Sequence, residues 1–144
     1  MEINYWAILL CGIVAMVLGA IWYGPLFGKV WIRVIGATSN DLAARKKMQQ
    51  SAGPLYIVQF LLSLFQIWVL VFFIRGWGVH TIGLPPTFFE NSIWIWAGFV
   101  LPTLAGTCMW NNESAKVSWT KFGLQAGYQL LNFIAFGLIL GMWR

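Results

Sequence analysis

Charged residues are what this sequence has least of. Nine Lys and Arg and four Asp and Glu amount to 9% of its 144 residues, whereas 60% of the residues are hydrophobic. A soluble domain carries about 25% charged residues and roughly 45–50% apolar ones. A chain this short also has too much surface for its volume to bury such an apolar excess. The composition therefore excludes a soluble globular enzyme, a disordered chain and a disulfide scaffold, and it predicts an integral membrane protein.

Groups that catalyse reactions or hold metals are equally scarce. The sequence has one histidine, His80, and two cysteines, Cys11 and Cys108. A single histidine cannot form a metal site alone, and no residue pattern indicates a nucleophile with an orienting base. The two cysteines should lie ~15 Å apart along the membrane normal, whereas a disulfide needs Cα atoms within roughly 7 Å. We expect two free buried thiols, no metal, no cofactor and no enzymatic activity.

Four long uncharged runs divide the chain, at residues 3–28, 48–74, 91–112 and 122–143. A helix rises about 1.5 Å per residue, so about 20 apolar residues cross the hydrocarbon core of a bilayer. Each run is long enough for one crossing and too short for two, which predicts an all-α, single-domain bundle of four transmembrane helices over residues 1–144. The expected helices lie near 4–24, 55–74, 92–110 and 122–142.

The stretch between the first two helices is expected to lie along the cytoplasmic surface. Gly24 and Pro25 predict the end of the first helix, because proline disfavours helix in the residue before it. Residues 27–36 mix aromatic, branched and basic residues, which is typical of a segment in the headgroup region. Residues 39–51 should then form a short polar helix that ends near Gly53–Pro54.

The distribution of basic residues predicts the orientation. Cytoplasmic loops of membrane proteins carry an excess of Lys and Arg. Loops 25–54 and 111–121 hold most of these residues, whereas the opposite side has only Arg75 and Arg144. We therefore expect both loops in the cytoplasm and both termini outside. The net charge of +5 then reflects topology and contact with membrane lipids, and we expect no binding to nucleic acid.

Two stripes of polar side chains cross the predicted helices, because residues three or four apart share one helix face. The stripe of the second helix is Tyr56, Gln59, Ser63 and Gln66, and that of the fourth is Gln125, Tyr128, Gln129 and Asn132. Unpaired amides are costly in hydrocarbon, so these side chains should face protein or water. The stripes predict either hydrogen bonds between helices or subunits, or a polar cavity that binds or passes a small solute.

Pairs of small residues four positions apart predict close helix contacts. They are Ala15 and Gly19 in the first helix, then Gly123 and Gly127, and Gly137 and Gly141, in the fourth. Such notches let two backbones approach each other in lipid, where van der Waals packing drives association. They fit packing within one chain and formation of a homo-oligomer equally well.

A family resemblance rests on the segment Trp22-Tyr23-Gly24-Pro25-Leu26-Phe27-Gly28-Lys29-Val30-Trp31. It resembles the signature of a bacterial membrane family catalogued as domain of unknown function 1761. The stretches Trp96-Ala97-Gly98-Phe99, Gly127-Tyr128 and Gly141-Met142-Trp143 follow in the family's order. The resemblance implies a small four-helix protein of the bacterial inner membrane, with no established activity and no catalytic residues. Physically, the segment predicts an interfacial motif: aromatic anchors at Trp22, Tyr23 and Trp31, a turn at Gly24 and Pro25, and a phosphate contact at Lys29.

Three functions follow from these observations. The first is a small homo-oligomeric transporter, channel or solute-binding protein whose polar interior is lined by the second and fourth helices. The second is a structural or partner-binding protein whose polar stripes only join helices. The third, an enzyme acting on lipid, is disfavoured because acid–base groups are missing from the predicted membrane interior.

Overall fold

The computed structural model describes residues 3–35, 42–78 and 88–143, and within these ranges the chain is helical and has no strand. Four stretches are long and apolar enough to cross a membrane: Tyr5–Leu26, Ala52–Gly76, Phe88–Met109 and Ala115–Met142. They confirm the predicted all-α architecture with four membrane-spanning helices. A bilayer favours this solution because each helix satisfies its own backbone hydrogen bonds.

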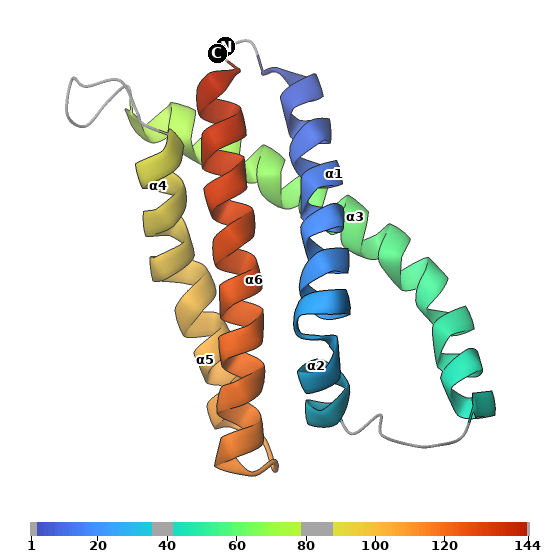
Figure 1. The fold of residues 1–144 in the computed structure, drawn as a ribbon. Helices are drawn as coiled ribbons and strands as arrows, with labels where there is room; N and C mark the ends of the chain where they lie inside the picture. Colours follow the sequence, from blue (N-terminus) through green and yellow to red (C-terminus); the bar gives the residue numbers. More distant parts are fainter. Residues whose placement is uncertain (1–2, 36–41, 79–87, 144) are drawn as a thin grey trace.

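The elements in chain order are α1 (Tyr5–Ile21), a wide turn at Trp22–Leu26, α2 (Gly28–Val34), α3 (Leu42–Gly78), α4 (Phe88–Ile95), a second wide turn at Trp96–Val100, α5 (Leu101–Met109) and α6 (Ala115–Met142). The start of α1 and the end of α6 lie at one end of the bundle, termed the terminal end (Figure 1). The helix α2 and the α5–α6 connection lie at the opposite end, termed the loop end (Figure 1).

Both wide turns accompany a proline. Pro25 lies inside the first, where Gly24 has the non-helical angles φ −100° and ψ −106°. The second immediately precedes α5, which has Pro102 in its first turn. A proline removes one backbone N–H and crowds the preceding turn, so the helix widens or kinks there. Thr103 Oγ1 donates to the Phe99 carbonyl at 2.6 Å, which satisfies an acceptor beside this turn.

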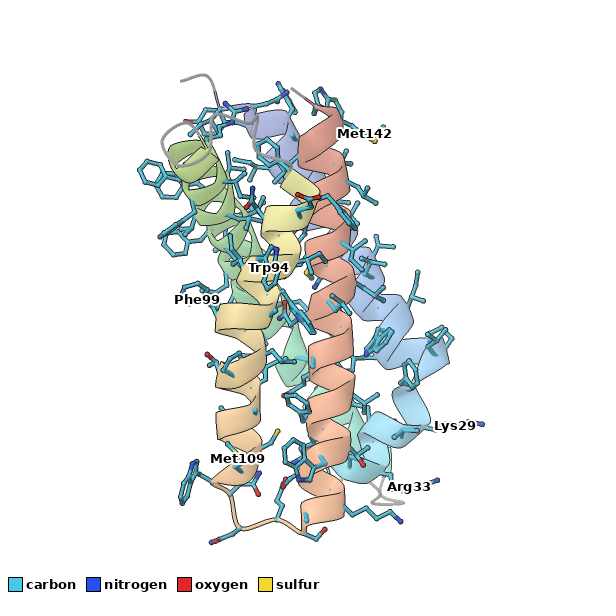
Figure 2. The ribbon with its side chains drawn as sticks, turned by 90° about the vertical axis from the view of Figure 1, so that its left-hand side faces the viewer. Lys29, Arg33, Trp94, Phe99, Met109 and Met142 are labelled. Carbon is cyan, nitrogen blue, oxygen red and sulfur yellow. The ribbon has the colours of Figure 1, made fainter. Side chains whose placement is uncertain are left out.

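The helix α6 lies at the centre of the fold, with α4 and α5 along one side and α1 along another (Figures 1 and 2). The buried core gathers Phe133, Phe136 and Leu140 of α6, Ala7, Cys11 and Ala15 of α1, Ile67, Val71 and Ile74 of α3, and Phe88 of α4. Both cysteines are free and buried, as the sequence predicts.

The predicted break at Gly53–Pro54 is wrong. The helix α3 runs without interruption from Leu42 to Gly78 and contains Pro54. It therefore fuses the expected polar helix at 39–51, of which residues 42–51 are described, with the second span. A proline is tolerated inside a membrane helix where water or neighbouring groups satisfy the freed carbonyl. The freed carbonyl here belongs to Gln50, an exposed residue near the end of the span.

The two ends of α3 have different surroundings. It crosses α1 obliquely and moves away from the other helices toward the loop end (Figure 1). Ile67, Leu70, Val71 and Ile74 are buried, whereas Leu55, Ile57, Leu61 and Phe65 are each more than half exposed. One half of α3 thus belongs to the core, while the other half leaves an opening between itself and the bundle.

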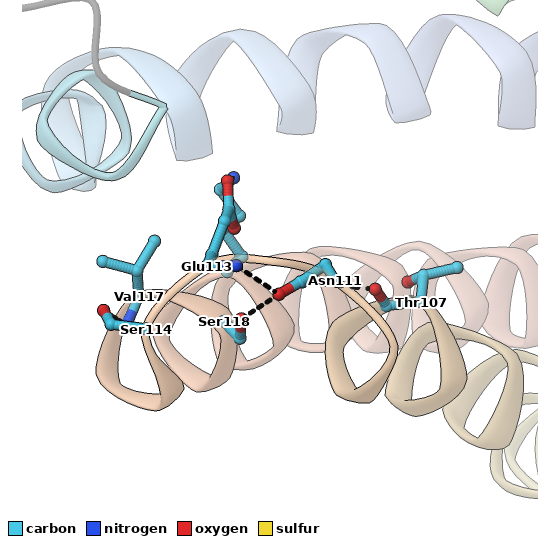
Figure 3. Close-up of polar contacts among 7 residues, drawn as sticks. Thr107, Asn111, Glu113, Ser114, Val117 and Ser118 are labelled. Carbon is cyan, nitrogen blue, oxygen red and sulfur yellow. Dashed lines mark hydrogen bonds and ion pairs between the residues drawn. The ribbon is translucent and has the colours of Figure 1, made fainter.

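The predicted loop 111–121 is shorter than expected, because α6 begins at Ala115. The Ser114 side chain caps α6 by accepting from the Val117 backbone N–H at 3.4 Å. Asn111 Oδ1 accepts from the Glu113 backbone N–H at 3.0 Å and from the Ser118 hydroxyl at 2.8 Å (Figure 3). Glu113 forms an ion pair with Lys121 of α6. These bonds hold α5 and α6 antiparallel.

Candidate functional site

A cleft of about 730 Å³ opens between α3 and the rest of the bundle at the loop end. We term it the polar cleft. Its walls come from α1, the first wide turn, α2, α3, α5 and α6. They are formed by Met16, Gly19, Ala20, Tyr23, Gly24, Trp31, Tyr56, Gln59, Leu104, Gln125, Tyr128 and Gln129.

The polar cleft brings together parts of both predicted stripes. Tyr56 and Gln59 contribute from α3, and Gln125, Tyr128 and Gln129 contribute from α6. Helical spacing alone placed each set on one face, and the tilt of α3 sets the two faces on opposite walls. The divergence of α3 keeps these walls apart, so the stripes line a space instead of closing on each other.

The other three stripe residues lie outside the polar cleft. Ser63 is buried, and its hydroxyl donates to the Gln59 carbonyl of the same helix at 2.9 Å. Asn132 is 3% exposed within the bundle. Gln66 lines a second hollow nearer the terminal end. The polar cleft therefore includes five of the eight stripe residues.

Hydrogen bonds inside the cleft are incomplete. The Tyr128 hydroxyl donates to the Ala15 carbonyl at 3.0 Å and so joins α6 to α1. The Gln59 amide Nε2 donates to Ser63 Oγ at 3.4 Å. In contrast, the Gln129 amide oxygen is buried and has no donor among the described residues. Leaving such a group unsatisfied costs about 1–3 kcal/mol.

The polar cleft carries no formal charge. None of the described residues that line it is acidic, basic or histidine. The described part of the chain also holds no cluster of three or more His, Cys, Asp or Glu side chains that fits a metal ion. The available chemistry is therefore hydrogen bonding by amides and phenols, together with contact to apolar and aromatic surfaces. Such walls suit a neutral, hydrogen-bonding molecule better than an ion.

The Trp22–Trp31 segment forms the loop-end wall of the cleft. Trp22 Nε1 donates to the Leu124 carbonyl of α6 at 3.0 Å. Its ring occupies the notch at Gly127, where a Cβ would lie 2.9 Å from Trp22 Cζ2. The Tyr23 ring contacts Trp31 and Tyr128, with ring centres 4.8 and 5.3 Å apart. The sequence predicts Trp22, Tyr23 and Trp31 as interfacial anchors and gives no sign that they shape the cleft.

Lys29 is the exception in this segment. Its side chain is exposed, and it points away from the bundle together with Arg33 (Figure 2). It lies on the outer surface of α2 and takes no part in the cleft. The apolar lining residues Met16, Ala20 and Leu104 gave no polar signal in the sequence, and only the fold reveals them as walls.

The predicted notches mostly receive partners within the chain. A Cβ on Gly19 would lie 3.1 Å from Tyr128 Oη, and one on Gly137 would lie 2.8 Å from Phe89 Cα of α4. Gly141 makes only an ordinary contact with Phe88, and Gly123 has no neighbour within 4 Å. A further notch that the sequence did not single out is Gly12, whose Cβ would lie 2.6 Å from Leu64 Cδ2 of α3.

The second hollow, termed the apolar groove, has a volume of about 400 Å³ and lies between α3, α6 and the second wide turn. It is lined by Phe65, Gln66, Val69, Leu70, Phe73, Ile95, Phe99, Val100 and Phe133. Gln66 is the only one of these side chains that can form a hydrogen bond. The groove therefore favours hydrocarbon.

The fold and this pair of hollows define a small helical membrane protein with an uncharged polar cleft. The chain belongs to the family described as "Protein of unknown function (DUF1761)", which matches residues 6–141 and so covers nearly the whole chain. This confirms the family resemblance carried by the sequence motifs. No curated protein and no solved structure shows significant similarity to the chain.

Proposed function

We propose that this protein is a non-enzymatic membrane protein that binds a small uncharged solute in the polar cleft, as a transporter, channel or solute-binding protein does. The observation that carries the proposal is the convergence of amide and phenol side chains on this one uncharged space. These groups come from the first wide turn, α3 and α6. A neutral molecule with hydroxyl groups matches this set of partners.

Glycerol is a suitable first probe because it is neutral and rich in hydroxyl groups. Saturation-transfer NMR on the full chain in nanodiscs should detect glycerol bound to the parent protein. Gln129→Leu and Gln59→Leu should each reduce the signal at least five-fold. Gln50→Leu, at an exposed glutamine of α3 outside the cleft, is the matched control and should leave the signal unchanged. A signal that persists in both cleft variants would contradict the proposal.

A structural or partner-binding role is the alternative, and two hydrogen bonds support it. Tyr128 bonds to the Ala15 carbonyl, and Trp22 bonds to the Leu124 carbonyl, so polar groups beside the cleft do join helices. Under this alternative, the same Gln→Leu variants should lower stability or change the oligomeric state while no solute binds. Thermal unfolding of the same samples therefore separates the two functions.

We further propose that the protein resides in a bacterial inner membrane, in contact with its lipids, with loops 25–54 and 111–121 in the cytoplasm. The excess of basic residues in these loops supports this orientation. In a variant that lacks both native cysteines, Asn112→Cys should react with a membrane-impermeant maleimide only after the cells are opened. Labelling of intact cells would reverse the orientation.

We also propose a homo-oligomer, supported by the uncovered notch at Gly123 on α6. Native mass spectrometry of protein released from nanodiscs should show a closed oligomer. The variant Gly123→Leu should shift it toward the monomer, because a bulky side chain prevents close approach of the backbones. A parent protein that is wholly monomeric would contradict this proposal.

A further inference from the structure

The polar cleft and the apolar groove follow one another along a single face of α3. Gln59 lines the cleft, whereas Gln66 and Phe73 line the groove. The intervals of seven residues keep all three on the same side of the helix. The helix rises about 20 Å between Gln59 and Phe73. One continuous face therefore changes from polar to apolar in the direction from the loop end to the terminal end.

The opposite walls also pass from the cleft to the groove in this direction, although only the α6 wall changes from polar to apolar. On α6, Gln129 lines the cleft, and Phe133, one turn further toward the terminal end, lines the groove. Across from it, Leu104 of α5 lines the cleft and Val100, one turn away, lines the groove. Because the passage from cleft to groove occurs within one helical turn on both walls, the two hollows adjoin each other.

We propose that the two hollows form one binding site for an amphiphile, with an uncharged hydroxyl-bearing head in the polar cleft and a single hydrocarbon chain in the apolar groove. A monoacylglycerol has this chemistry. This inference rests on the proposed function, since it assigns the solute in the cleft to the head of a larger ligand. The apolar groove by itself would accept any hydrocarbon, and the amide and phenol side chains that line the adjoining cleft supply selection for the head.

The site changes from polar at the loop end to apolar further inside, which matches a ligand that enters from the bilayer. The polar cleft lies at the loop end, where the exposed Lys29 and Arg33 mark one surface of the bundle (Figure 2). The groove extends from there toward the middle of the spans. A lipid of the leaflet at the loop end has the same arrangement, with its head at the surface and its chain inward. The divergence of α3 leaves the side of the bundle open for such a ligand.

The test compares monopalmitoylglycerol with glycerol on the full chain in nanodiscs. Native mass spectrometry should show stoichiometric retention of monopalmitoylglycerol, and competition should show that it binds at least ten-fold more tightly than glycerol. Val69→Trp, which fills the groove, should lower retention of monopalmitoylglycerol at least ten-fold and leave the glycerol NMR signal intact. Val58→Trp is the matched control on the exposed face of α3, outside both hollows, and should change neither value.

Each other outcome overturns the inference in a distinguishable way. Equal affinity for the two probes, with no effect of Val69→Trp, would refute the amphiphile and leave the proposed function standing. If neither probe binds, both the amphiphile site and the proposed function are contradicted. If Val69→Trp and Val58→Trp lower the retention of monopalmitoylglycerol equally, the retained molecules are bulk lipid around α3 and not a ligand of the groove. A dimer that dissociates in Val69→Trp, without retained lipid, would make the groove a contact between subunits.

A second variant guards against misfolding of the first. Val100→Trp fills the groove from the opposite wall, because Val100 lies in the wide turn before α5. Its retention of monopalmitoylglycerol should fall as in Val69→Trp. Normal retention in a folded Val100→Trp protein would overturn the assignment of the chain to this groove.

Discussion

The terminal half and the loop half of the bundle are packed differently, although the same four spans run through both. In the terminal half, Phe133 and Phe136 of α6 are almost fully buried among apolar neighbours. In the loop half, the next turns of α6 present Gln125, Tyr128 and Gln129 to the polar cleft. At these positions packing follows the polarity of each turn, since amides and phenols need hydrogen-bond partners that a closed apolar core does not offer. Asn132 is the exception, because it is buried and its Oδ1 has no donor among the described residues.

The largest expected effect falls in the terminal half. Gly137→Leu should destabilise the protein by about 3 kcal/mol, because a side chain there meets the backbone of α4 and neither helix can move away cheaply. The measurement is unfolding in mixed micelles by titration with denaturing detergent. Gly106→Leu, in the loop half, has open space around it and should leave unfolding unchanged. Equal losses of stability in the two variants would show that the terminal half is not packed more tightly than the loop half.

The second largest expected effect is a gain in stability, and it concerns the loop half. Gln129→Leu should stabilise the fold by about 1–3 kcal/mol while it abolishes binding, because it removes a buried acceptor that has no donor. Thermal unfolding of the protein without added probe would show the gain. A loss of stability in this variant would mean that Gln129 is paired in the membrane, as the structural alternative requires.

A smaller effect is expected where the two halves meet. Tyr128→Phe removes the hydrogen bond to the Ala15 carbonyl and leaves the ring in place, so it should cost about 0.5–1.5 kcal/mol. Tyr5→Phe, at an exposed tyrosine of α1 that forms no hydrogen bond with its side chain to any described residue, serves as the control and should be neutral. If both variants behave alike in thermal unfolding, the bond between α6 and α1 contributes no stability.

The smallest effect is expected at the α5–α6 connection. Asn111→Ala removes an oxygen that accepts two hydrogen bonds near the surface, and we expect a loss of about 0.5 kcal/mol. Hydrogen exchange of the Glu113 amide should also become faster, because that amide loses its acceptor. Asn112→Ala, at the neighbouring exposed position, should leave both measurements unchanged. Unaltered hydrogen exchange of the Glu113 amide in Asn111→Ala would show that Asn111 does not order the α5–α6 connection.

Helix boundaries show where sequence reasoning succeeds and where it stops. The expected first helix at 4–24 and the observed span Tyr5–Leu26 agree closely, because an apolar run and a Gly–Pro stop are both local signals. The break expected at Pro54 failed because α3 continues beyond its span, where water can satisfy the freed carbonyl. The early start of α6 at Ala115 depends on the Ser114 cap, a local signal that the charged residues after it obscured.

The features of the candidate site also divide into those that the sequence predicted and those that it did not. Periodicity placed Gln59 on one helix face and Gln129 on another, and the structure sets both faces on the polar cleft. Periodicity gave no reason to separate Gln66 and Asn132 from them, because spacing along one helix carries no information on where a partner helix diverges. The contact of Trp22 with Gly127 was equally hidden, since it joins residues far apart in the chain.

The sequence by itself determined that the chain forms four membrane-spanning helices and which apolar run each of them contains. It could do so because backbone hydrogen bonds must be satisfied within each apolar segment, and the length of that segment is fixed by the bilayer. Only the tertiary structure decided that α3 leaves the bundle at the loop end, that Trp22 closes onto α6, and that a polar and an apolar hollow adjoin. The tilt of a helix in lipid follows from side-chain packing against its neighbours, which no single segment encodes.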